Sequence, residues 1–138
     1  KWYWLSLNLA AVATLFGHEG FEGEVLIGKE TVSGQFSGMT LLKRCNIAGQ
    51  FIIATKRTHD DGLMDMGLCR KVGGFRLIQL SIAFEKQGFA GHPEVIFREA
   101  PVVEATFTRP RVLDFDGELI EAASARWEIL PKALTVLD

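Results

Sequence analysis

The sequence predicts a mostly-β domain, an antiparallel two-layer β-sandwich with one or two covering helices. After Gly17 the chain consists of short runs rich in β-branched and aromatic residues, separated by Gly, Asp and Pro, which is typical of antiparallel strands and tight turns. Apolar and polar residues alternate over 103–107 and 113–115, so one sheet face should be buried and the other solvated. With 138 residues, the chain has room for a single domain with one core, residues 1–138.

Two segments have helical spacing. Leu5, Leu9, Val12 and Phe16 share one helix face, although residues 3–9 also alternate as a strand would. A second helix is expected over 75–86. Its apolar face combines a central stripe with three flanking residues: Leu77, Leu80, Ser81 and Phe84, then Phe75, Ile78 and Ile82. Strands are expected at 23–27, 30–36, 38–46, 50–56, 64–70, 94–99, 101–108, 111–116, 125–130 and 133–137.

Composition and charge exclude several classes of protein. Hydrophobic residues make up 48% and charged residues 23% of the chain, and the mean hydropathy is +0.16, values of a folded globular domain. The net charge of −2 offers no basic surface for nucleic acid. The N-terminal apolar run superficially resembles a signal peptide, but Ser6 and Asn8 interrupt it, and no run is long enough to span a membrane. Cys45 and Cys69 form no CxxC, which favours reduced thiols and a cytoplasmic location.

Familiar catalytic motifs are absent or incomplete. Residues 23–29 match the GxxxxGK part of a P-loop, but Glu30 stands where Ser or Thr is required, and the intervening residues 25–27 favour a strand. The three histidines lack the spacing of a zinc site, and there is no GxGxxG or GxSxG.

Two acidic turns remain as candidate sites. They are His59-Asp60-Asp61-Gly62-Leu63-Met64-Asp65 and Asp114-Phe115-Asp116-Gly117-Glu118. An Asp-Gly pair between extended runs is first of all a tight turn. If residues 111–116 form a strand with Leu113 and Phe115 inward, the two aspartates project from the opposite face. Clustered carboxylates suit general-base or metal-assisted phosphoryl transfer, and solvated turn charges would give the same pattern.

In order and spacing, residues 46–138 resemble the C-terminal half of the diacylglycerol kinase and sphingosine kinase type of lipid kinase, including its bacterial members. The matching features are Asn46 with Gly49, the two acidic turns, the helix 75–86, Gly91-His92-Pro93-Glu94-Val95, and 130–137. The resemblance implies a β-sandwich that follows a nucleotide-binding half carrying a GGDGT motif. That motif is absent from these 138 residues, and the family's Pro-x-Ala is replaced by Thr55-Lys56-Arg57.

The resemblance also implies residue roles. Asp116 would be the general base on the lipid hydroxyl, and Glu118 would support catalysis by contacting ATP or its magnesium waters. A Mg²⁺ ion would be held by the Asp61 carboxylate and by the backbone carbonyls of Leu63 and Thr58. ATP would be a co-substrate only together with the N-terminal half, so the chain alone is expected to be inactive.

Partners follow from the same reading. We expect a lipid substrate, and either an N-terminal kinase domain or self-association. The paired cations at 43–44, 56–57 and 70–71 would contact the inner membrane surface. The alternative is that they are solvated surface charges with no binding role. The helix 75–86 and the aromatic residues Trp2, Trp4 and Phe16 would line a lipid pocket or form plain core. The alternative function is a stand-alone, noncatalytic lipid- or ligand-binding sandwich.

Overall fold

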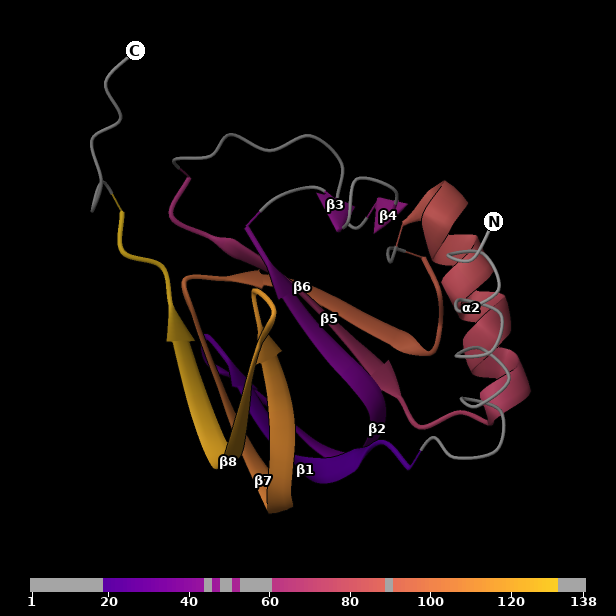
Figure 1. Ribbon diagram of the computed structural model, residues 1–138. Helices are drawn as coiled ribbons and strands as arrows, with labels where there is room; N and C mark the ends of the chain where they lie inside the picture. Colours follow the sequence, from indigo (N-terminus) through magenta and orange to yellow (C-terminus); the bar gives the residue numbers. More distant parts are fainter. Residues whose placement is uncertain (1–18, 44–45, 48–50, 53–60, 89–90, 132–138) are drawn as a thin grey trace.

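The computed structural model describes residues 19–43, 46–47, 51–52, 61–88 and 91–131 (Figure 1). Within these ranges the chain is mostly antiparallel strand with one helix, as the sequence predicts. The elements are β1 (Phe21–Ile27), β2 (Glu30–Leu42), β3 (Asn46–Ile47), β4 (Phe51–Ile52), β5 (Met64–Arg70), α2 (Gly74–Gln87), β6 (Val95–Ala100), β7 (Val102–Phe115) and β8 (Glu118–Glu128).

Six strands form one sheet in the order β6-β5-β2-β1-β7-β8, and every neighbouring pair is antiparallel. The remaining two, β3 and β4, pair with each other. The register shifts within two long strands, between Phe36 and Gly38 in β2 and between Thr106 and Arg111 in β7. Figure 1 shows β7 and β8 bending sharply, so that the half of their hairpin next to the connecting turn, its far half, folds back. Pro110 lies in the shifted part of β7, where its missing N–H is tolerated.

The core lies on the face of the sheet opposite α2, since core residues of β5 alternate with those that line the hollow beside the helix. Its buried residues come from five strands: Val25, Ile27, Phe36, Met64, Met66, Leu68, Ala100, Val103, Ala105 and Phe107. Leu113, from the far half of the β7–β8 hairpin, packs against this core cluster. The hairpin therefore covers the core like a second layer, which explains how one continuous sheet makes the predicted sandwich.

The helix α2 covers the other side of β2, β5 and β6. Leu80 is buried, and Leu77, Ile78 and Phe84 are half-buried, so the apolar residues of the predicted stripe face inward, whereas Ser81 is exposed. Phe75 and Ile82 are 70% and 55% exposed, which makes the buried face narrower than the sequence indicated. The helix ends at Gly88, whose positive φ of 73° allows its N–H to reach the Phe84 carbonyl.

Two polar links fix α2 to the sheet. Before the helix, the Val72 N–H donates to the Ser37 hydroxyl on β2 at 3.0 Å. Within the first turn, the Arg76 guanidinium pairs with Glu94, just before β6, at 2.8 Å. The chain turns at His92-Pro93, where the Val95 N–H donates to the His92 carbonyl at 3.0 Å at the start of β6.

Strand boundaries test the remaining sequence predictions. The strand 64–70 is found as predicted, and the runs 30–36 and 38–46 belong largely to the continuous strand β2. Residues 118–124 were not expected to be extended, yet they form the first half of β8 because they pair with β7. The expected helix at the N-terminus, with Trp2, Trp4 and Phe16, and the strand 133–137 lie outside the described residues. Among the described helices, none is long and apolar enough to cross a membrane.

Candidate functional site

The second acidic turn is the tip of the β7–β8 hairpin. Phe115 pairs with Glu118, so Asp116 and Gly117 are the two turn residues. Both have positive φ, 51° and 93°, as a type I′ turn requires, and Asp tolerates this conformation. The Asp114 carboxylate accepts the Gly117 N–H at 2.8 Å and closes the turn. Asp114 is therefore used structurally, whereas Asp116 is not.

Asp116 and Glu118 are both exposed at this tip. Neither side chain has a hydrogen bond or ion pair within the described part of the chain. The structure thus presents two carboxylates to solvent, two residues apart and held by a tight turn. Such groups can accept a proton or ligate a hydrated cation when a partner surface closes over them.

Apolar side chains surround the carboxylates on the far half of the hairpin. Val112, Phe115, Leu119 and Ile120 are all more than half exposed. Phe115 shares the face of Leu113, as expected from alternation, but it is 56% exposed and so is not buried there. Because Leu113 and Ile120 are paired on one face and Leu119 faces the other way, both faces of the hairpin carry apolar groups. A hairpin that met only water on its outer side would keep that side polar.

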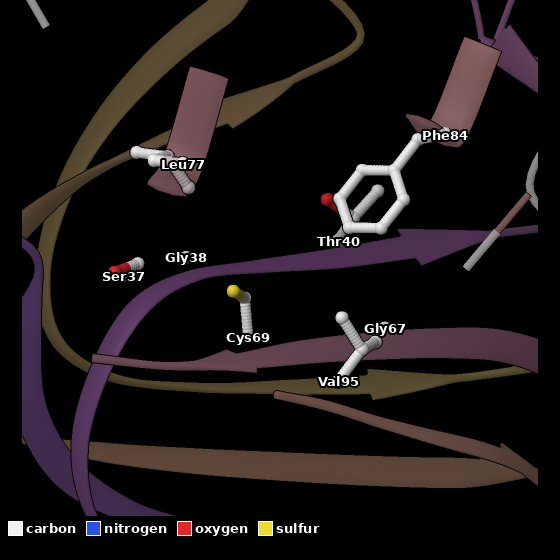
Figure 2. A pocket seen from close by; sticks show the side chains of 8 residues that line it. All are labelled: Ser37, Gly38, Thr40, Gly67, Cys69, Leu77, Phe84 and Val95. Carbon is white, nitrogen blue, oxygen red and sulfur yellow. The ribbon is translucent and has the colours of Figure 1, made fainter. Parts of the chain in front are cut away.

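A depression of about 200 Å³ lies between α2 and the sheet (Figure 2). Leu77 and Phe84 line it from the helix, and strands β2, β5 and β6 supply the rest: Ser37, Gly38, Thr40, Gly67, Cys69 and Val95. The Cys69 thiol faces this space, and burial raises the pKa of the thiol, with Glu94 adding to the effect. On its sheet side, α2 therefore borders a small, mainly apolar hollow, and the raised pKa favours the protonated form of the Cys69 thiol.

The first acidic turn lies at the start of β5, and a lysine reaches into it. The Lys43 ammonium donates to the Asp61 carboxylate at 2.5 Å and to the Leu63 carbonyl at 2.8 Å. The Leu63 N–H also donates to the same Asp61 oxygen at 3.0 Å. Gly62 has a φ of 72°, which lets the loop fold tightly around these atoms. Sequence reasoning treated Lys43 only as half of a cationic pair, and it missed this contact.

The residues fit the predicted Mg²⁺ poorly. Two of the three expected ligand groups already hold the Lys43 ammonium, and the third, Thr58, lies outside the described residues. Even at an effective dielectric of about 20, a divalent ion about 4 Å from an ammonium would be repelled by about 8 kcal/mol. Across the described ranges, there is no cluster of three or more His, Cys, Asp or Glu residues that could hold a metal.

The fold and these turns define a β-sandwich domain that presents an acidic hairpin. Comparison with known families places it further: residues 5–138 match the YegS C-terminal NAD kinase beta sandwich-like domain. The chain belongs to this family. This confirms the lipid-kinase resemblance drawn from the sequence, and it extends that resemblance to the part of the chain before residue 46.

Three solved structures from Bacillus anthracis str. Sterne have a similar fold. Two, each provisionally described as a diacylglycerol kinase, have TM-scores of 0.70 and 0.67 with 16% and 13% identity, over 91% and 88% of this chain. A third, described as one of the diacylglycerol kinases, has a TM-score of 0.61 with 12% identity over 84%. The chain corresponds to only 43%, 41% and 43% of their respective lengths. No curated protein matches the sequence.

Proposed function

We propose that this chain is the lipid-binding and catalysis-supporting domain of an ATP-dependent lipid kinase, which transfers the γ-phosphoryl group to a lipid hydroxyl such as that of diacylglycerol or a sphingoid base. The family match supports the class. The observation that carries the residue assignment is Asp116, an exposed carboxylate held at a positive-φ turn position beside a structurally used Asp114.

In this proposal the reaction occurs where the hairpin tip meets a nucleotide-binding domain. The Asp116 carboxylate accepts the proton of the lipid hydroxyl while the hydroxyl oxygen attacks the γ-phosphorus. A new oxygen–phosphorus bond forms, the bond to the bridging oxygen breaks, and ADP leaves. Glu118 faces the nucleotide or the waters of its magnesium. ATP and its metal belong to the partner half, and the site on this chain supplies the base.

The apolar surface of the hairpin supports a partner domain. Val112, Phe115, Leu119 and Ile120 expose apolar groups around the carboxylates, and an adjoining domain would bury them and exclude water from the acidic tip. The relatives are about twice as long as this chain, which leaves length for such a domain. Without it, the same surface favours self-association, and we expect no turnover of ATP.

A pair of asparagine substitutions tests the base. In a protein where a nucleotide-binding half with the GGDGT motif precedes this chain, Asp116→Asn should lower ATP-dependent lipid phosphorylation about 10³-fold. Asn tolerates the positive φ, so the turn should survive. The matched control is Asp114→Asn, which removes the same charge but keeps the oxygen that accepts the Gly117 N–H. Equal activity of the two variants would refute the assignment of Asp116.

The second candidate is a noncatalytic lipid-binding module, favoured by the apolar hollow under α2. Lipid binding and phosphate transfer, measured side by side, separate the two functions. A module predicts that the 138-residue chain binds a fluorescent acyl lipid without nucleotide, and that no phosphorylated lipid forms even when the nucleotide-binding half is present. The kinase proposal predicts radiolabelled phosphate on the lipid.

A further inference from the structure

The contact between Lys43 and the first acidic turn is built by the sheet. In the β2–β5 pair, Leu42 lies opposite Asp65, which places Lys43, the next residue, beside the loop that leads into β5. The ammonium then bridges the Asp61 carboxylate and the Leu63 carbonyl across 18 and 20 residues of sequence. The Leu63 N–H shares the same carboxylate oxygen, so cation, side chain and backbone form a closed ring of contacts.

This lysine differs from the other ion-paired cations on the sheet. The side chains of Lys43 and Asp61 are 30% and 23% exposed, whereas those of Arg98 and Glu30 are 46% and 48% exposed. Arg98 also donates to a backbone carbonyl, that of its neighbour Phe97, but Lys43 joins a carboxylate and a carbonyl that belong to the same loop, 18 and 20 residues away in sequence. The Lys43 ammonium thus contacts a carboxylate oxygen and a main-chain carbonyl oxygen, which are typical ligands of a hard metal ion.

We propose that the Lys43 ammonium is a built-in cation of this domain, occupying the oxygen site that the family resemblance assigns to Mg²⁺. An ammonium supplies one positive charge and three N–H donors, which suffices to hold a carboxylate and a carbonyl together without a metal. The loop 61–63 is then organised by the chain itself. Magnesium would be needed only with the nucleotide, and the stability of this domain would not depend on it.

Thermal unfolding of three chains tests the proposal. Wild type, Lys43→Met and the control Lys29→Met, which removes an exposed lysine at the β1–β2 turn, are compared in EDTA and in MgCl₂ with ionic strength matched by NaCl. Met retains the length of the side chain and removes the charge. Lys43→Met should melt lower than Lys29→Met in EDTA and regain about 4 °C at about 10 mM Mg²⁺, whereas wild type and Lys29→Met should shift by less than about 1 °C.

Several results would overturn the proposal. A saturable rise of the wild-type midpoint in Mg²⁺, reversed by EDTA, would show that the metal displaces the ammonium. A Lys43→Met chain as stable as the control would show that the contact organises nothing. A destabilised Lys43→Met chain that ignores Mg²⁺ would show that these oxygens are not a cation site.

Amine acylation keeps the proposal testable if Lys43→Met fails to fold. The wild-type chain is treated briefly with an N-hydroxysuccinimide ester, with and without MgCl₂, and each lysine is followed by peptide mass spectrometry. Lys43 should react several-fold more slowly than Lys29, and the ratio of the two rates should be unchanged by Mg²⁺. A Lys43 that reacts as fast as Lys29, or only when Mg²⁺ is added, contradicts the built-in cation.

Discussion

Gly23 is predicted to be indispensable for the pairing of β1 with β7. An ideal Cβ on Gly23 would lie 2.2 Å from the Thr106 carbonyl oxygen, and 3.2 Å from the Phe107 Cα. Carbon–oxygen contacts between strands are normally about 3.3 Å or longer, so Gly23→Ala must push the strands apart by about 1 Å. Both obstacles are backbone atoms, which have no rotamer to change. Overpacking of this kind costs about 3 kcal/mol, or about 10 °C in the unfolding midpoint for a domain of this size.

Gly38→Ala is the matched control for this prediction. Gly38 also lies in a strand, β2, but a Cβ built there meets no heavy atom within 4 Å. The variant should stay within about 0.5 kcal/mol of wild type, or gain slightly from the lower entropy of its unfolded chain. Urea unfolding followed by far-ultraviolet circular dichroism gives both free energies. Equal stabilities for the two alanine variants would refute the close approach of β1 and β7.

Two further predictions concern the surface. A backbone hydrogen bond at Glu94 and the Arg76 guanidinium hold the pKa of the Glu94 carboxyl below its ordinary value, so the stability that this carboxylate contributes is present above that value and is lost as the pH falls through the lowered pKa. The stability gap between wild type and Glu94→Gln should therefore shrink between about pH 6 and about pH 3, and a gap that stays constant in urea titrations would contradict the linkage. On the hairpin, Leu119→Ser should reduce self-association in sedimentation velocity without changing the unfolding midpoint, because Leu119 is 71% exposed. If the wild-type chain sediments only as a monomer at high concentration, the exposed apolar residues of the hairpin do not cause self-association.

The predictable part of the fold is the part with a clear repeat. The strand 64–70 and the helix expected at 75–86 were found with boundaries correct to within one residue, because strand composition and helical spacing are unambiguous there. Residues 118–124 show the limit of this reasoning. Leu119 and Ile120 are adjacent and alanines follow, so neither period appears, and only pairing with β7 makes the segment extended.

In the candidate site too, local features could be predicted from the sequence and long-range contacts could not. The turn at Asp116 and Gly117 was predictable because turn chemistry is local. The exposure of Phe115 was not, since alternation alone assumes that the inner face of a strand is covered by its own domain. The contact of Lys43 with Asp61 depends on the register of β2 against β5, and no local pattern in the sequence reports a register across 18 residues.

The coding DNA upstream of Lys1 tests the central claim most directly, because the proposed role of Asp116 requires a nucleotide-binding partner. The account predicts an in-frame extension that encodes an α/β pattern containing GGDGT, which would make this chain the second half of a lipid kinase. A start codon or a signal sequence immediately before Lys1 would contradict the account, and would leave lipid binding by a free-standing sandwich as the function to pursue.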